Sequence, residues 1–295
     1  MGNIPTLQSL IAGRWHGQQS HTPLHSALDN ALIYHTHAEQ IDFDEALRYA
    51  RKTGIGQLMS LDFQKRAQRL KALALYLMER KEELYEISHL TGATRQDSWV
   101  DVEGGIGTLF AYASMGSREL PSSNVLHEGP AMALGKRGGF AGTHILVPRG
   151  GVAVHINAFN FPIWGLLEKF APSFLAAMPC IAKPATATSY LTHAVVRMMM
   201  ESNLLPSGAL QLVIGSTGDL LDRLGGFDAV TFTGSADTAA KLKANQNLIR
   251  SSVPFTAEAD SLNCAILAPD VTPDDPEFDL FVKEVAREMT GKAGQ

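Results

Sequence analysis

Short apolar runs alternate with segments of helical spacing over residues 151–256, and this alternation limits the folds open to the chain. The apolar runs are rich in Val and Ile, which is typical of buried strands. The predicted strands lie near residues 152–156, 180–183, 210–214, 228–232 and 252–256, and the predicted helices near 163–177, 188–202, 217–224 and 235–244. Because parallel strands are joined by right-handed crossovers through helices, this order predicts an α/β fold with a doubly wound parallel sheet.

The first of these strands leads through a polar and aromatic turn into a helix that starts near Pro162. A proline suits the first turn of a helix, because its missing N–H has no partner there in any case. A strand that runs into a helix N-terminus directs backbone N–H groups toward a bound anion. Lys183 ends the next parallel strand, on the edge of the sheet where such folds bind ligands. The sequence therefore predicts a cofactor or phosphate site at this edge.

The N-terminal half reads mainly as helices. Residues 12–15 predict a small hairpin, and Asp42 with Glu45 predicts a capped helix that runs through Lys52. Residues 64–89 predict one long amphipathic helix with Arg66 among its polar positions, and residues 98–115 predict another. Gly104 and Gly105 fall inside this second helix with no strand before them. We therefore favour close helix packing over a phosphate loop for these glycines.

The segments outside this pattern predict three further elements. The Gly-rich, basic residues 129–142 have apolar flanks around Met132 and residues 145–147, which predicts a two-stranded arm. Residues 263–267 predict one more strand, and Phe278 begins a last helix that ends near Met289.

The composition excludes several classes of protein. Twenty-five basic and thirty acidic residues give a net charge of −5, which argues against nucleic-acid binding. Residues 161–182 approach membrane length, but Glu168 and Lys169 would each cost about 2.5 to 3.5 kcal/mol at mid-span, so we expect no membrane anchor. The first ten residues lack the features of a secretory signal. Cys180 and Cys264 have no paired spacing, and we place both in buried strands of a cytoplasmic protein.

The histidines predict no metal site. Four of them form two close pairs, His21 with His25 and His35 with His37, but no Cys or carboxylate cluster accompanies these pairs. We interpret all four as solvated loop residues.

Several motifs together resemble the aldehyde dehydrogenase family. They occur in the order and spacing of that family: Asn160-Phe161-Pro162, Lys183-Pro184-Ala185, Phe232-Thr233-Gly234-Ser235 and a lone Glu258. The longer string Glu-Ala-Asp-Ser-Leu-Asn, which starts at Glu258, resembles one branch of the family. That branch is the dehydrogenase half of bifunctional ring-opening proteins of phenylacetate breakdown. The resemblance implies a Rossmann-like coenzyme domain at 1–128 and 150–258, an oligomerisation arm at 129–149, and the start of a catalytic domain at 259–295.

The resemblance implies catalytic roles for Asn160 and Glu258. From spacing alone, Asn160 is more simply a helix cap. By resemblance, its amide N–H stabilises the oxyanion formed from the aldehyde. Glu258 follows an apolar run and has small or apolar neighbours, a setting that suits a general base. By resemblance, it activates the nucleophile or the deacylating water.

The resemblance also implies the cofactor-binding residues. Lys183 would hold the ribose of the cofactor, and Ser235 would bind the pyrophosphate, although a plain helix cap also explains this serine. Thr186 stands where NAD-selective relatives often carry Glu, so we expect NADP, with NAD as the alternative. The remaining candidate positions are Ile156, Asn157, Ala158, Phe159, Ala185, Gly215, Phe232, Thr233 and Gly234.

The nucleophile of the family is a cysteine in a Gly-Gln-x-Cys motif, and Gly294-Gln295 match its first two residues. The resemblance therefore implies a nucleophile just beyond residue 295, and no activity for residues 1–295 alone. The implied reaction is oxidation of a semialdehyde carried as a CoA thioester, by a homo-oligomer. Two alternatives remain open. One is the semialdehyde dehydrogenase of the aerobic benzoyl-CoA route, and the other is a non-catalytic nucleotide-binding or assembly fragment.

Overall fold

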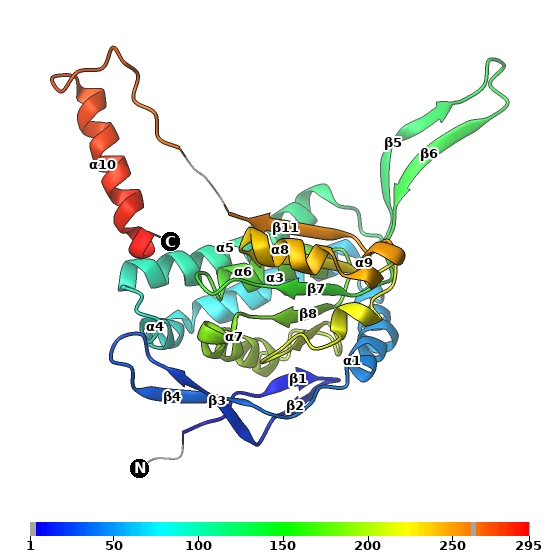
Figure 1. Cartoon of the computed structure of the whole chain (residues 1–295). Helices are drawn as coiled ribbons and strands as arrows, with labels where there is room; N and C mark the ends of the chain where they lie inside the picture. Colours follow the sequence, from blue (N-terminus) through cyan, green and yellow to red (C-terminus); the bar gives the residue numbers. More distant parts are fainter. Residues whose placement is uncertain (1–3, 261–263, 295) are drawn as a thin grey trace.

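The computed structural model describes residues 4–260 and 264–294, and its centre is a seven-stranded sheet (Figure 1). The strand order is β11-β10-β7-β8-β9-β1-β2, in which the first five strands are parallel and β1 runs antiparallel to both of its neighbours, β9 and β2. The strands are β1 (Ser9–Ile11), β2 (Arg14–His16), β7 (Ala153–Ile156), β8 (Cys180–Lys183), β9 (Leu210–Leu212), β10 (Ala229–Gly234) and β11 (Phe255–Ala259). The N-terminal hairpin predicted from residues 12–15 therefore extends the edge of the main sheet.

Both faces of the sheet are covered, as a doubly wound fold requires. Along β8, Cys180 and Ala182 face one hydrophobic core while Ile181 faces the other, because side chains alternate along a strand. The first core contains α3 (Phe63–Met78), α4 (Lys81–His89), α5 (Arg95–Glu119), α6 (Trp164–Leu175) and α7 (Ser189–Glu201). The second contains α1 (Phe43–Tyr49), α8 (Ala236–Lys243), α9 (Gln246–Arg250) and the 3-10 turn η3 (Leu220–Arg223). The predicted fold class is confirmed.

Several helix boundaries differ from the prediction. The helix expected over residues 64–89 is two helices, α3 and α4, with a break at Glu79 and Arg80. The helix capped by Asp42 continues past Lys52 as the π-helical turn η1 (Ala50–Gly54) and then as α2 (Ile55–Met59). The expected helix over 217–224 is only the turn η3, and α9 was not predicted.

Arg66 is not a surface residue, as the pattern of polar positions suggested. Its side chain is fully buried and donates hydrogen bonds to the carbonyl oxygens of Leu58 and Leu175 and to Oδ1 of Asn124. These bonds use Nε and Nη1 of the guanidinium, whereas Nη2 is buried without a hydrogen-bond partner among the described residues.

Two small hairpins lie outside the main sheet. The first, β3 (Ser20–His25) with β4 (Leu32–His37), carries the four histidines that we predicted to lie in loops. His37 is buried, and its Nε2 lies 2.7 Å from Oγ of Ser9. The predicted loop positions are therefore wrong, whereas the predicted exposure holds for His21 and His25 and fails for His37. Within the described ranges, no three His, Cys, Asp or Glu side chains are grouped so that they could hold a metal ion.

The second hairpin is the predicted arm. It consists of β5 (Leu126–Ala133) and β6 (Ala141–Leu146) and projects away from the body (Figure 1). Its surface is unusually apolar for an exposed element, with Met132, Leu134, Phe140, Ile145 and Leu146 all exposed.

The C-terminal part forms helix α10 (Pro276–Thr290) and the short turn η4 (Gly291–Gly294). Figure 1 shows α10 apart from the sheet, with its end returning toward α4 and α5. None of the residues in α10 is buried. The predicted strand over 263–267 is not formed at residues 264–267, and residue 263 lies outside the described residues. Among the helices that the structure describes, none has the length and apolar character needed to cross a bilayer.

Candidate active site

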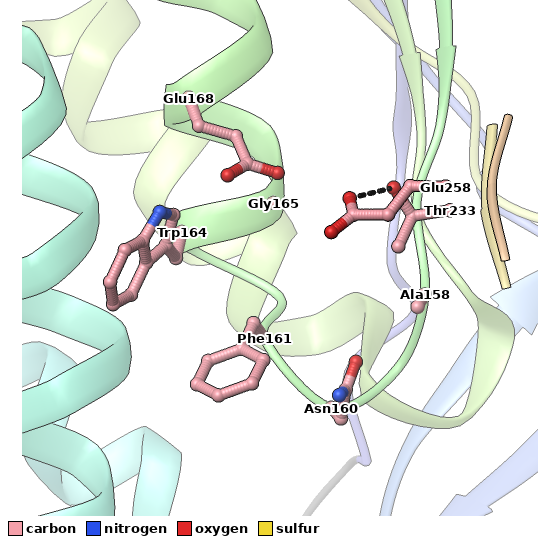
Figure 2. A pocket seen from close by; sticks show the side chains of 8 residues that line it. All are labelled: Ala158, Asn160, Phe161, Trp164, Gly165, Glu168, Thr233 and Glu258. Carbon is pink, nitrogen blue, oxygen red and sulfur yellow. Dashed lines mark hydrogen bonds between the residues drawn. The ribbon is translucent and has the colours of Figure 1, made fainter. Parts of the chain in front are cut away.

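A cavity of about 280 Å³ lies at the carboxyl ends of β7, β10 and β11. It is lined by Ala158, Asn160, Phe161, Trp164, Gly165, Glu168, Thr233 and Glu258 (Figure 2). The parallel pairing of β10 with β11 places Thr233 beside Glu258, and Thr233 Oγ1 donates a hydrogen bond of 3.3 Å to Glu258 Oε2. The two predicted catalytic residues, Asn160 and Glu258, therefore lie on the wall of one cavity.

Asn160 does not cap α6, although spacing alone favoured that role. The backbone N–H groups at the start of α6 are instead capped by Asp101 of α5, whose Oδ1 accepts from Ile163 at 3.2 Å and from Trp164 at 2.8 Å. Asp101 is buried, and burial raises its pKa to about 6 against the lowering effect of these N–H groups and of Lys292. Sequence reasoning missed this residue, although Asp101 falls on the buried stripe of α5 with Val102 and Ile106.

The turn that carries Asn160 is held from several sides. Thr188 Oγ1 donates to the carbonyl of Phe159, and Thr192 Oγ1 donates to the carbonyl of Pro162, both at 3.0 Å. The ammonium of Lys292 lies 4.3 Å from the centroid of the Phe161 ring, a cation–π contact. These contacts fix the backbone on both sides of the Asn160 side chain.

Glu258 differs from its prediction in two respects. It lies within β11 rather than after the strand, and it is exposed rather than enclosed by apolar residues.

A second cavity of about 780 Å³ contains Lys183, Thr186 and Gly215, three of the predicted cofactor-binding residues. It is also lined by the hairpin β3–β4, including His37, and by Glu39, which follows β4. Burial lowers the pKa of Lys183, and Lys183 makes no ion pair within the described residues. A desolvated ammonium without a counter-charge is well suited to an anionic or hydroxyl-bearing ligand.

The other predicted cofactor residues lie at the carboxyl ends of β7, β8 and β10 or just after them. Asn157 is buried at the end of β7, and neither atom of its side-chain amide has a hydrogen-bond partner in the described structure. Ser235 caps α8, as predicted, by accepting from the backbone N–H of Thr238 at 3.3 Å. Ala158 and Thr233 line the first cavity, and Phe159 is exposed beside it. Ile156, Ala185, Phe232 and Gly234 line neither of the two cavities.

Neither cysteine faces Asn160 and Glu258. Cys180 is buried in β8, as predicted, and burial raises the pKa of its thiol to about 12. Cys264 is exposed and lies outside any strand, so its predicted burial is wrong.

A doubly wound sheet with cavities at the carboxyl ends of its strands is the architecture of the nucleotide-binding α/β proteins. A model of the aldehyde dehydrogenase family matches residues 15–295. The chain belongs to the aldehyde dehydrogenase family.

The relatives refine this assignment. The chain is 44% identical over 291 residues to a 3,4-dehydroadipyl-CoA semialdehyde dehydrogenase from Aromatoleum evansii. The matched region covers 98% of this chain and 56% of the relative. It is 24% identical to a chloroplastic betaine aldehyde dehydrogenase from Atriplex hortensis, which covers 91% of this chain and 54% of the relative. The chain thus spans about half the length of the curated relatives it matches.

Solved structures share the fold. A lactaldehyde dehydrogenase has a TM-score of 0.84 at 21% identity, covering 99% of this chain and 59% of the other. A betaine aldehyde dehydrogenase from Staphylococcus aureus, in complex with NAD+, has a TM-score of 0.76 at 20% identity, covering 94% of this chain and 54% of the other.

Proposed function

We propose that the protein oxidises an aldehyde to an acid with a nicotinamide dinucleotide, and that Asn160 and Glu258 act on the reacting carbon. The observation that carries this proposal is that both residues line one cavity, at the sheet edge that also holds Lys183 and Thr186. The amide of Asn160 would donate a hydrogen bond to the oxygen that becomes negatively charged. Glu258, exposed to solvent, would take a proton from the water that releases the acid.

We further propose NADP as the cofactor. The buried, unpartnered amide of Asn157 and the desolvated ammonium of Lys183 fit a polar ligand at this edge. Ser235 and the N-terminus of α8 would hold its pyrophosphate. Thr186 offers a hydroxyl and no negative charge, which favours a 2′-phosphate over a free 2′-hydroxyl. When bound, the nicotinamide would accept the hydride that leaves the aldehyde carbon. NAD is the alternative, and it is the cofactor of the related betaine aldehyde dehydrogenase structure.

The proposed substrate is a semialdehyde carried as a CoA thioester. The motif resemblance favours the ring-opened semialdehyde of phenylacetate breakdown. A second candidate is 3,4-dehydroadipyl-CoA semialdehyde, because the relative with that activity is 44% identical over 291 residues. Both are thioesters from the degradation of aromatic compounds, so the proposed chemistry is the same.

The nucleophile would be a cysteine that follows Gln295, since Cys180 and Cys264 are both outside the cavity of Asn160 and Glu258. We propose a homo-oligomer assembled through the arm β5–β6, whose exposed apolar side chains would be covered by a partner subunit. A cytoplasmic location fits two unpaired cysteines.

Two polypeptides test the proposal: residues 1–295, and the chain extended through the residues that follow Gln295. NADPH formation at 340 nm is measured with each CoA semialdehyde, beside calorimetric titration with NADP and NAD. The extended chain should oxidise at least one thioester, with a higher kcat/KM for NADP than for NAD. Residues 1–295 should bind NADP weakly and form no NADPH. Nucleotide binding without any oxidation by the extended chain would favour a non-catalytic nucleotide-binding protein.

A further inference from the structure

The cavity of the proposed active site contains a second carboxylate, Glu168 of α6. Figure 2 shows the carboxylates of Glu168 and Glu258 directed into the cavity from opposite walls. Glu168 Oε1 accepts a hydrogen bond of 2.5 Å from Lys169 Nζ, while Oε2 has no partner among the described residues. The side chain of Lys169 is only 12% exposed, so this contact holds the carboxylate in place with one oxygen free.

The rest of the cavity indicates which way the substrate chain extends. The pocket of Lys183, Thr186 and Gly215 is reserved for the cofactor in the proposed function, so the aldehyde must approach from another direction. A further cavity of about 440 Å³ adjoins the first, because both are lined by Glu168 and Glu258. Its other walls are Thr108, Tyr112, Lys169, Thr231, Phe232 and Thr256. An aldehyde held between Asn160 and Glu258 would therefore extend past Glu168.

Close packing holds the aromatic wall of the first cavity in place. A Cβ atom at Gly104 would lie 2.4 Å from the ring of Trp164, so this glycine allows the indole to pack directly on α5. Phe161 and Trp164 form an aromatic pair on the same side, with ring centroids 5.9 Å apart. The substrate arm thus runs between an aromatic wall and the free oxygen of Glu168.

The passage carries a net negative charge. Glu168 and Glu258 are two carboxylates, and Lys169 is the one ammonium among the residues that line both parts of the cavity. A semialdehyde that ends in a free carboxylate would bring a third negative charge into this space, at a cost that grows as water is excluded. A thioester arm is neutral where it leaves the acyl chain, and its amide N–H groups can donate to Glu168 Oε2.

We propose that Glu168 is a specificity-determining residue that rejects ω-carboxylate semialdehydes and admits neutral arms that donate hydrogen bonds. This inference rests on the proposed function, and it explains why the substrate would be handled as a thioester rather than as the free acid. The negative charge of Glu168 disfavours semialdehydes with an ω-carboxylate. Its free Oε2 favours thioesters, because it can accept a hydrogen bond from their amide N–H groups.

The test uses the chain extended past Gln295 with three substrates of equal chain length. These are a neutral straight-chain aldehyde, the semialdehyde with a free ω-carboxylate, and the N-acetylcysteamine thioester of that semialdehyde. Glu168→Gln should raise kcat/KM for the free acid relative to the neutral aldehyde by about tenfold, equivalent to about 1.4 kcal/mol. The thioester should change by less than about threefold, because a Gln oxygen still accepts a hydrogen bond.

Glu201→Gln is the matched control, since Glu201 pairs with Arg197 on the exposed face of α7, outside this cavity. It should leave the ratio of free acid to neutral aldehyde unchanged. In the wild-type protein, raising the ionic strength should also increase this ratio, and this measurement needs no substitution. An acid-to-neutral ratio that is the same in wild type and Glu168→Gln and insensitive to salt overturns the role of Glu168. Oxidation of none of the three aldehydes by any variant overturns the proposed function itself.

Discussion

The carboxylate of Asp101, in α5, accepts the backbone N–H of Trp164, the first residue of α6, at 2.8 Å. The two residues are 63 positions apart, so the helix that follows Asn160 is capped by a distant segment rather than by its own N-terminal residues. A buried anion at a helix N-terminus interacts favourably with the helix dipole. The position of the proposed oxyanion donor therefore depends on the packing of α5 against α6.

Replacement of Asp101 by Asn should change how the stability of the protein depends on pH. Burial raises the folded-state pKa of Asp101 from 3.8 to about 6, so between these values the folded state binds more protons than the unfolded state. The wild-type free energy of unfolding should therefore fall as pH rises from 4 to 6, by up to about 3 kcal/mol from this group alone. Asp101→Asn keeps an acceptor oxygen and removes this titration.

Urea denaturation at pH 4, 5, 6 and 7 measures the difference. The wild type should lose more stability than Asp101→Asn across this range, and Asp270→Asn, at an exposed position, should follow the wild type. Parallel stability profiles for wild type and Asp101→Asn would show that Asp101 does not titrate in this window.

The contact between α5 and α6 can be tested through two glycines of the same helix. A Cβ atom at Gly105 would lie 2.9 Å from Cα and 3.0 Å from N of Trp164, whereas a Cβ atom at Gly107 would meet nothing within 4 Å. Gly105→Ala should destabilise the protein by about 1 to 3 kcal/mol through overpacking. Gly107→Ala should stabilise it by about 0.5 to 1 kcal/mol, because Ala is the better helix former. Thermal denaturation compares the two, and shifts of the same sign would contradict the predicted contact.

The parallel sheet was predictable because its strands are continuous apolar runs, a pattern that belongs to strands buried on both faces. The cofactor edge with Lys183 was predicted because the carboxyl ends of such strands share one edge, whereas the catalytic roles of Asn160 and Glu258 were inferred from the motif resemblance. The break between α3 and α4 was not predictable, because apolar residues keep their helical spacing across Glu79 and Arg80.

The roles of polar residues whose partners are distant in sequence could not be predicted either. The pattern around Arg66 shows only a charge on an amphipathic helix, yet its guanidinium bonds the carbonyl of Leu175, 109 positions away. Asp101 is the same case with Trp164 as partner. Glu258 is the opposite case, since it was predicted to be enclosed and is exposed. Its exposure depends on which segments cover β11 and not on its immediate neighbours.

The cofactor preference should respond to a charge at position 186. Thr186 shares a cavity with Lys183 and Gly215, and a carboxylate there would lie close to a 2′-phosphate. In the chain extended past Gln295, Thr186→Glu should lower the ratio of kcat/KM for NADP to that for NAD by about 5- to 150-fold, from about 1 to 3 kcal/mol of repulsion. Ala187→Glu places the same charge at the exposed neighbouring position and should have a smaller effect. An unchanged ratio in Thr186→Glu would mean that the 2′-phosphate lies elsewhere.

Glu258→Gln isolates the proposed proton transfer from binding. Gln has the same size and can still accept the hydrogen bond from Thr233 Oγ1, so the fold of β11 should be preserved. Without a basic group on this wall, turnover in the extended chain should fall about 100-fold or more, as is usual when a general base is lost. The dissociation constant for NADP should remain within about threefold of wild type, since Lys183 and Thr186 are in a different cavity.

Stopped-flow measurement of the first turnover and of the steady state identifies the step that Glu258→Gln slows. A normal first turnover with slow later cycles would assign Glu258 to release of the acid, and a slow first turnover would assign it to activation of the nucleophile. Turnover within a few-fold of wild type would remove Glu258 from the mechanism.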